Sequence, residues 1–337
     1  FWSVASSKDG NVVAEGGVAD KLRKMAVVDR TLYTDTAGTG STLETFTLTD
    51  VKDYYVTDAL LAAELGVLEA EIDNTLNWAS GIDVDDENDD GSTTDTRYDI
   101  FADPLHSKPL VINYGDSIRI VIGTNAGVLH MFEDNTATDV VTESWAFMPK
   151  EFFPNIKSLR ENYSSADKGY GIDGKITSYM QDENGDGIIN GTDKVYIFFG
   201  LRRGGSSYYA LDISDPSAPE LMWKIDASSD DMSELGQSWA KPKVAYSKLN
   251  IVDGVAKPVL FIGGGYDIIK DAAGVGGAGG SDTVGRGIFM LDAETGALKW
   301  SLTPSVSSDT NTQNTGITDS IPSSVGVLDS DLDGMVD

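Results

Sequence analysis

The sequence predicts an all-β fold, a β-propeller assembled from repeated four-stranded units. Short runs of β-branched and aromatic residues, separated by Gly, Asp and Pro, dominate the chain from about residue 101 onward. Tryptophans recur near the end of each unit, at Trp145, Trp223 and Trp300, so that successive tryptophans are 78 and 77 residues apart. Each unit also contains an apolar run that ends in Gly and a second run that ends in Asp. Such regularity is typical of blades arranged around an axis.

The first 100 residues are expected to form an N-terminal segment of mixed character, and residues 101–337 the partial propeller. Alternating apolar and polar residues at Arg30–Thr34 and Leu43–Thr49 predict two short strands. One helix is expected over Thr57–Trp78, because Thr57 or Asp58 can cap its first turn and leucines recur along one face. An acidic loop follows at residues 83–95.

Three blades follow in order, each opened by a strand that precedes the two apolar runs. Blade one is expected to contain strands at Ser107–Ile112, Ile118–Gly123, Gly127–Asp134 and through Trp145. Blade two should contain strands at Gly174–Tyr179, Val195–Gly200, Tyr208–Asp212 and through Trp223. Blade three should contain strands at Ala240–Ala245, Val259–Gly264, Gly287–Asp292 and through Trp300. The connection Glu151–Asp173 between the first two blades is interpreted as a loop.

A fourth blade is expected to begin with a strand at Pro322–Leu328. Three blades and the start of a fourth do not close a ring, and a complete propeller of this kind is expected to have seven. The chain also opens with Phe1 and Trp2 rather than Met, so we expect it to be an internal fragment.

The composition excludes several classes of partner. The formal net charge is −29, which opposes binding to nucleic acid or to anionic lipid and favours divalent cations. The chain has no cysteine and only two histidines, His106 and His130, so thiolate sites are excluded and zinc is not expected. No run of about 20 apolar residues occurs, so no membrane-spanning helix is expected.

The run Asp182–Asp193 has the spacing of a twelve-residue calcium loop. Such loops supply oxygen ligands from positions 1, 3, 5, 7, 9 and 12 and place a glycine at position 6. Gly187 occupies position 6, and the ligand positions hold Asp182, Asn184, Asp186, the carbonyl of Ile188, Asn190 and Asp193. The last ligand is Asp instead of the usual Glu, so a moderate affinity is expected. The repeat places this loop between the first two strands of blade two.

Two further runs repeat this spacing. The stretch Asp329–Asp337 lies at the matching place of blade four and offers Asp329, Asp331, Asp333, the carbonyl of Met335 and Asp337. The acidic loop of the N-terminal segment matches only the first six positions, with candidate ligands Asp86, Asn88 and Asp90 and Asp95 as the late ligand. The alternative interpretation of each run is a solvated acidic turn between strands.

No combination of acid, base and nucleophile stands out at a recognisable motif spacing. The segment Leu291–Trp300 resembles the tryptophan-docking motif of quinoprotein dehydrogenase propellers, in which the tryptophan packs against the next blade. A quinone-dependent dehydrogenase is therefore one alternative class, although the chain lacks the vicinal cysteine pair of such enzymes. An integrin-like or lectin-like calcium propeller is another.

Several segments together resemble a known family. They are Asp103–Pro109, Val121–Phe132, Trp145–Pro149, Tyr170–Gly174 and Gly285–Asp292. Over about residues 78–337 the chain is similar to the propeller domain of the PilY or PilC proteins of type IV pili. In that family a nine-residue calcium loop lies in a blade, and it matches Asp329–Asp337. The resemblance does not extend to the loop at Asp182, whose assignment depends on spacing alone.

The resemblance implies a calcium-dependent, non-enzymatic adhesin that is exported to the pilus tip on the bacterial surface. It further implies a role in pilus assembly against retraction, in surface adhesion and in twitching motility. The implied partners are minor pilins of the tip complex and a host or abiotic surface. The chain contains no Arg-Gly-Asp tripeptide, so integrin binding of that type is not expected.

Overall fold

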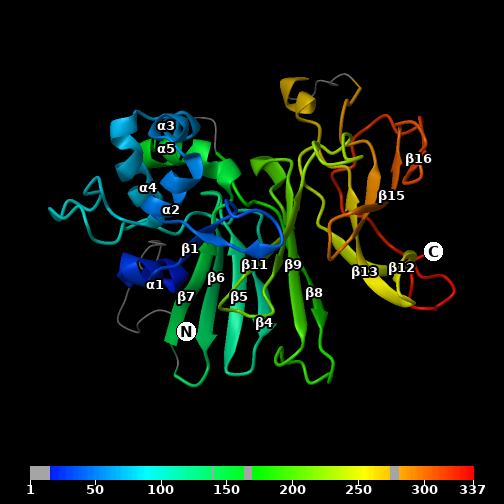
Figure 1. The fold of residues 1–337 in the computed structure, drawn as a ribbon, viewed down its shortest axis with the longest axis horizontal. Helices are drawn as coiled ribbons and strands as arrows, with labels where there is room; N and C mark the ends of the chain where they lie inside the picture. The colour runs from blue at the N-terminus through cyan, green and yellow to red at the C-terminus, as the bar shows by residue number, and fades with distance from the viewer. Residues whose placement is uncertain (1–15, 139, 163–168, 274–280) are drawn as a thin grey trace.

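Three β-sheets stand side by side in the computed structural model, which describes residues 16–138, 140–162, 169–273 and 281–337 (Figure 1). The first blade contains β4 (Leu110–Asn113), β5 (Ser117–Gly123), β6 (Leu129–Asn135) and β7 (Val140–Phe147). The second contains β8 (Ile176–Gln181), β9 (Lys194–Gly200), β10 (Tyr208–Asp212) and β11 (Glu220–Ile225). The third contains β12 (Lys243–Val252), β13 (Val255–Gly263), β14 (Ile288–Asp292) and β15 (Leu298–Thr303). Each blade is a four-stranded antiparallel meander, so the predicted propeller class is confirmed.

Neighbouring blades are packed through the two faces of their central strands. In β9, Val195, Ile197 and Phe199 lie in the core shared with the first blade. The alternate residues Tyr196 and Phe198 lie in the core shared with the third blade. Because side chains alternate between the faces of a strand, a strand buried on both faces must be apolar throughout. This is why the central strands appear in the sequence as continuous apolar runs.

Two of the three repeated tryptophans, Trp145 and Trp223, fasten their blade to the next, as predicted. The indole N–H of Trp145 donates to the carbonyl of Pro216 in blade two at 3.0 Å. That of Trp223 donates to the carbonyl of Ala293 in blade three at 3.0 Å. A side chain at Gly296 would meet the Trp223 ring at 2.9 Å, so the glycine provides the flat surface on which the ring lies. Both tryptophans are almost completely buried.

Residues before 100 extend the blades at their outer edges. Strand β1 (Leu32–Thr34) pairs in parallel with β7, and β3 (Glu44–Thr45) pairs with β1. Strand β2 (Ser41–Thr42) pairs with β11 of blade two. Strand β16 (Asn311–Gln313) covers the outer edge of blade three in the same way. Each addition satisfies backbone groups that an exposed edge strand would leave unpaired.

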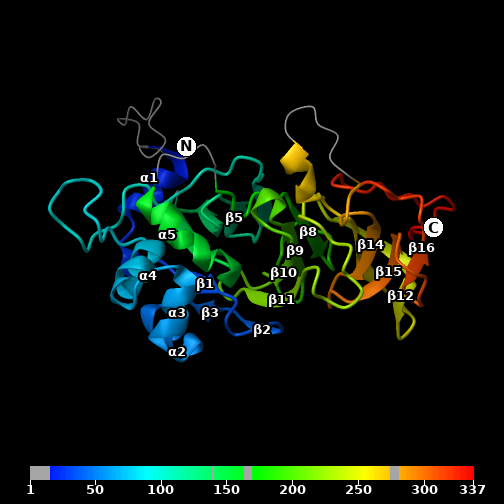
Figure 2. The same cartoon turned by 90° about the horizontal axis from the view of Figure 1, so that it is seen from above.

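The helices gather beside the first blade, at the opposite end of the molecule from β14–β16 (Figure 2). They are α1 (Gly17–Lys24), α2 (Leu48–Tyr55), α3 (Asp58–Leu65), α4 (Ile72–Ser80) and α5 (Phe153–Glu161). Short 3-10 turns occur at Val27–Asp29, Glu69–Glu71, Lys150–Phe152, Arg202–Gly204 and Ile268–Ala273. No helix in the described ranges is long and apolar enough to cross a membrane.

The single helix predicted over Thr57–Trp78 is wrong, because the structure has two helices there. Thr57 does cap the first of them, since its hydroxyl accepts the N–H of Leu60 at 3.3 Å. Gly66 then adopts a left-handed conformation (φ 66°) and ends α3 one residue after Leu65. Leu68, one of the leucines that recur in this part of the sequence, is 76% exposed. A continuous stripe in the sequence therefore does not require a continuous helix.

Three other predictions need correction. The strand predicted at Leu43–Thr49 is cut short because Thr47 caps α2, its hydroxyl accepting the N–H of Asp50 at 3.1 Å. The connection Glu151–Asp173, interpreted as a loop, contains α5, which buries Phe153 and Ile156. Residues 163–168 of this connection lie outside the described ranges. The segment Pro322–Leu328 forms no strand, since the described residues give it no ladder partner.

Candidate metal-binding loops

The loop Asp182–Asp193 connects β8 and β9, the place that the repeat predicts. The carboxylate of Asp182 accepts the N–H groups of Gly185 and Gly187, both at 2.7 Å. Asp186 accepts the N–H of Ile188 at 2.8 Å. Gly187 has φ 77°, a conformation that glycine adopts without strain. Side chains at positions 1 and 5 are thus turned inward over the loop.

The other two loops repeat this hydrogen-bond pattern position by position. The carboxylate at position 1 accepts the N–H of the glycine at position 6, at 2.8 Å for Asp329 and 3.0 Å for Asp86. The carboxylate at position 5 accepts the N–H at position 7, at 2.9 Å for Asp333 and 2.8 Å for Asp90. Asn184, Asp331 and Asn88 at position 3 each accept the N–H two residues later. The three runs therefore share one backbone geometry.

A further carboxylate closes each loop by accepting the N–H at position 2. Asp193 does so at 3.0 Å and Asp337 at 2.9 Å. In the acidic loop the closing carboxylate is Asp83, which precedes the loop and accepts the N–H of Glu87 at 2.9 Å. Asp83 was not predicted from the sequence, because the calcium-loop pattern takes its ligands only from position 1 onward and Asp83 precedes Asp86, which holds position 1. The Asp83 carboxylate is fully buried, and its second oxygen has no hydrogen-bond partner among the described residues.

Two further candidate ligands, Asp95 and Asn190, lie near the ends of their loops. Asp95 lies at the base of the acidic loop, where its carbonyl accepts the N–H of Asp83 at 2.9 Å. Asn190 lies near the end of its loop, and its amide reaches the carbonyl of Ile188 at 3.4 Å. The same loop is tied to blade one, because the Asn113 carbonyl accepts the N–H of Ile189 at 2.9 Å. This loop thus joins two blades.

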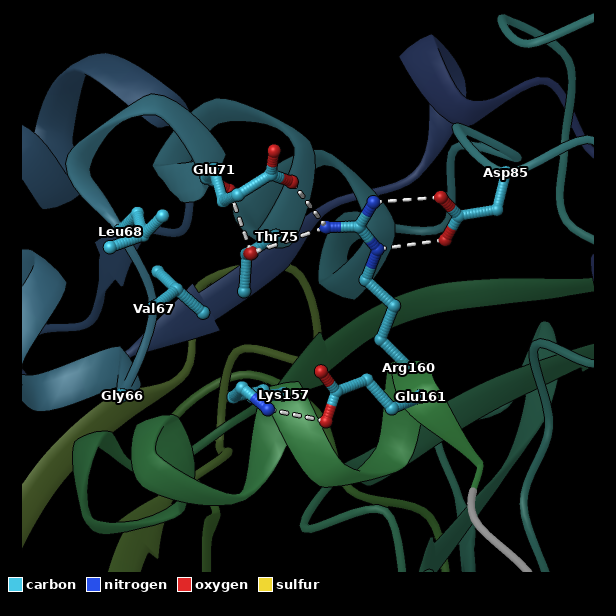
Figure 3. Close-up of a pocket in the computed structure, with 9 residues that line it drawn as sticks. All are labelled: Gly66, Val67, Leu68, Glu71, Thr75, Asp85, Lys157, Arg160 and Glu161. Carbon is cyan, nitrogen blue, oxygen red and sulfur yellow. Dashed lines mark hydrogen bonds and ion pairs between the residues drawn. The ribbon is translucent and has the colours of Figure 1, made fainter.

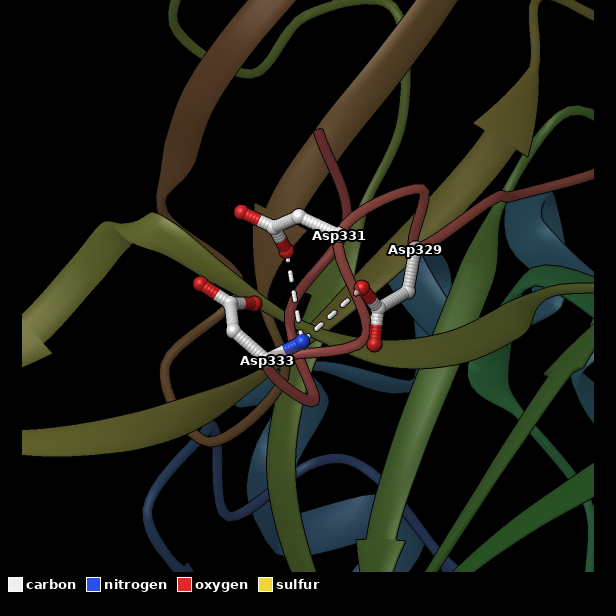
Figure 4. A group of neighbouring side chains, drawn as sticks. All are labelled: Asp329, Asp331 and Asp333. Carbon is white, nitrogen blue, oxygen red and sulfur yellow. Dashed lines mark hydrogen bonds between the residues drawn. The ribbon is translucent and has the colours of Figure 1, made fainter.

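Asp329, Asp331 and Asp333 bring three carboxylate oxygens within 4.8 Å of one another. Figure 4 shows Asp329 and Asp331 converging on the N–H of Asp333, each at 3.2 Å. The ammonium of Lys248 on β12 lies 2.8 Å from Asp333 and within 3.7 Å of Asp337. The hydrogen bond from Lys248 lowers the pKa of Asp333. Crowded, ionised carboxylates of this kind suit a hard cation such as Ca²⁺.

A cluster of charges is buried beneath the N-terminal segment. The Arg30 guanidinium lies 2.6 Å from Glu143, and His130 Nδ1 lies 2.6 Å from the other oxygen of the same carboxylate. Arg30 also donates to the carbonyl of Ser80 at the end of α4, at 2.9 Å. Burial lowers the pKa of His130, so the neutral ring donates from Nδ1 to Glu143. Burial would raise the pKa of Glu143, but the Arg30 charge and the His130 hydrogen bond outweigh it and lower that pKa to about 2.

The second histidine belongs to a junction between blades one and two. The buried Asp173 carboxylate lies 2.8 Å from His106 Nδ1 and 3.1 Å from the Arg202 guanidinium. Both contacts are made by the same oxygen, and the other oxygen of this carboxylate accepts the backbone N–H of His106 at 3.2 Å. The junction fixes the start of β4 against the segment that follows β9.

A cavity of about 540 Å³ lies between the helices, lined mainly by residues of α5 and of the turn after α3 (Figure 3). Its principal charge is Arg160, which donates two hydrogen bonds of 2.7 Å to Asp85. Lys157 is paired with Glu161 within the same helix. Both of these cationic groups already have acidic partners, and the Arg160–Asp85 pair ties α5 to the acidic loop.

The chain is similar to a family model, to curated proteins and to a solved structure. A family model described as the PilY1 beta-propeller domain matches residues 105–337. The type IV pilus biogenesis factor PilY1 of Pseudomonas aeruginosa PAO1 is 27% identical over 220 residues, covering 65% of this chain and 16% of that protein. A PilY1 homolog of Xylella fastidiosa is 32% identical over 130 residues, covering 37% of this chain and 9% of the homolog. The crystal structure of the P. aeruginosa PilY1 C-terminal domain is 26% identical and covers 66% of this chain and 36% of that one, with a TM-score of 0.40.

Proposed function

Since the matched model covers well over half of the chain, this protein belongs to the PilY1 β-propeller family, and we propose that it serves in type IV pilus biogenesis as a calcium-stabilised propeller. The chain spans less than a fifth of the length of the curated relatives above. The role of the whole protein is therefore an inference from relatives that are named as pilus biogenesis factors.

The observation that carries the calcium part of the proposal is the repeated geometry of the loops. Loops Asp182–Asp193 and Asp329–Asp337 turn their carboxylates inward with the same hydrogen bonds, although 147 positions separate their first residues. An acidic chain gains most from neutralising such groups, since each carboxylate raises the energy of its neighbours. The ligands we assign are those that the spacing predicts, together with Asp83 in the acidic loop.

Calcium is proposed to act mechanically in these loops. The loop Asp182–Asp193 is bonded to blade one through Asn113. The loop Asp329–Asp337 is bonded to β12 through the N–H of Val336, which donates to the carbonyl of Tyr246 at 2.7 Å. Neutralising the carboxylates would keep both connections closed under load. A pilus that extends and retracts places such load on its tip, so we propose an exported, pilus-associated location, with minor pilins and a host or abiotic surface as partners. On this proposal the chain supports adhesion and twitching motility and catalyses no reaction.

The pilus role is tested by deleting the gene in its own bacterium and counting surface pili. We expect a loss of at least about tenfold in sheared pilin, restored by the parent gene. The double variant Asp186→Ala/Asp333→Ala should restore fewer pili at an equal protein level. The control Asp116→Ala, in the short turn between β4 and β5 of blade one, should restore them fully. In cells whose pili cannot retract, the deletion should have little effect. Normal piliation in the deletion strain would contradict the proposed role.

A further inference from the structure

The first strands of the three blades converge around one cavity. The hydroxyl of Thr177 on β8 donates to the carbonyl of Pro242, just before β12, at 2.8 Å. The N–H of Lys241 donates to the hydroxyl of Ser324, at the matching place of the fourth unit, at 3.2 Å. A cavity of about 470 Å³ lies where these strands begin. Ligand sites in proteins commonly have volumes of roughly 300–1,000 Å³.

Each blade contributes one lysine to this cavity from the same position of the repeat. Lys108 lies two residues before β4, Lys175 immediately before β8 and Lys241 two residues before β12. All three are exposed. None of the three ammonium groups has a hydrogen bond or an ion pair with any described residue. Most of the other lysines in the described ranges pair with Asp or Glu, as Lys52, Lys157 and Lys257 do.

This concentration of positive charge is unexpected in a chain with a large excess of acidic residues. The sequence has 54 acidic and 25 basic residues, yet none of the described residues that line the cavity is acidic. Arg202 also lines it, but the buried Asp173 behind it balances that charge. The three lysine charges are therefore left uncompensated by protein groups at a single opening.

The wall behind the lysines is built from side chains that contact one another closely. The Arg202 guanidinium lies 4.2 Å from the centre of the Trp239 ring, and that ring stacks on Tyr266 with 4.5 Å between centroids. Asp173 holds His106 and Arg202 in place. A packed wall with exposed cations around it can select a ligand by its charge and size.

We propose that this cavity binds a small anion that carries at least two carboxylate or phosphate groups. Lysine ammonium groups are compact charges suited to such oxygens, and three of them from different blades require a ligand with more than one charged group. Such an anion would bridge the blades at the axis while calcium acts at the distant hairpin loops. The inference does not depend on the pilus role or on calcium.

The test is isothermal titration calorimetry of the full chain with citrate and, separately, with inorganic pyrophosphate. At about 50 mM salt we expect binding of at least one of them, weakened severalfold at about 500 mM salt, because charge interactions are screened. Tighter binding of citrate would identify carboxylates as the preferred group, and tighter binding of pyrophosphate would identify phosphates. No heat of binding up to about 10 mM of either anion would overturn the proposal.

The triple variant Lys108→Gln/Lys175→Gln/Lys241→Gln should lose at least about tenfold in affinity while its melting temperature stays close to that of the parent. A matched control, Lys21→Gln/Lys52→Gln/Lys194→Gln, removes the same charge elsewhere and should keep binding within about twofold. Equal losses in both variants would show a general charge effect and would overturn the assignment of the site. Unchanged binding in the first variant would overturn it as well.

Discussion

Replacing Glu143 with glutamine is expected to destabilise the chain by about 3–5 kcal/mol, because it leaves the Arg30 charge buried without a counter-charge. The side chain of Arg30 is 4% exposed and that of Glu143 is fully buried, so water cannot replace the lost partner. Equilibrium unfolding in urea measures the change. The matched control is Glu133→Gln, which breaks a partly exposed pair with Arg119 on neighbouring strands and should cost less than about 1 kcal/mol.

A compensating variant separates the charge effect from loss of packing. Arg30→Met/Glu143→Gln removes both charges and keeps an acceptor for His130, so it should recover about half of the lost stability. The segment before residue 100 should become sensitive to protease in Glu143→Gln, since Arg30 also bonds to Ser80. Equal stability of Glu143→Gln and the parent would show that the buried pair contributes nothing to holding this segment.

The same cluster predicts loss of stability in acid. The pKa of Glu143 is about 2 in the folded chain and about 4.3 in the unfolded chain. The ionised carboxylate therefore contributes fully to the stability of the fold above about pH 4.3, and this contribution is lost as the pH falls toward 2. The pKa of His130 is also lowered in the folded chain. As the pH falls below about 6.5, His130 is therefore protonated in the unfolded chain before it is protonated in the folded chain, and stability begins to fall. In Glu143→Gln the part of the decline below about pH 4 should be smaller.

Replacing Trp223 with alanine is expected to cost about 3–5 kcal/mol, because the ring fills the interface between blades two and three and donates to Ala293. Trp300 occupies the same position of the repeat but is only half-buried, and its indole donates to the hydroxyl of Thr312 at 3.2 Å. Trp300→Ala should therefore cost roughly 1–2 kcal/mol. Similar losses in the two variants would show that docking on the next blade is not what makes the tryptophan stabilising.

The blades could be predicted from the sequence because their information is local and repeated. The apolar runs of β9, β10 and β14 and the spacing of the tryptophans define strands without reference to distant residues. The attachment of β1 to β7 could not be predicted, since it joins Leu32 to Ala146 across more than 100 residues and three-residue strands carry little pattern. Helix α2 was missed because its cap, Thr47, lies within an alternating run that also suits a strand.

The candidate loops could be predicted from the spacing of their ligands. The carboxylates that close them could be predicted for two of the three loops. Asp193 and Asp337 follow their loops in the expected order, whereas Asp83 reaches its loop from the preceding residues. Lys248 approaches Asp333 from another blade, a contact that only the fold creates. The three cavity lysines lie at matching repeat positions, yet nothing in the sequence shows that they line one cavity.

The calcium content of the purified chain tests the central claim most directly. After dialysis against calcium, mass spectrometry should find at least two ions per chain, one fewer in Asp186→Ala and one fewer in Asp333→Ala, with no loss in Asp116→Ala. A chelator should lower the melting temperature, since a site with a Kd of about 10 µM gains roughly 2.7 kcal/mol in 1 mM free calcium. Less than one bound ion per chain, or a content that neither loop variant changes, would contradict the calcium-stabilised propeller.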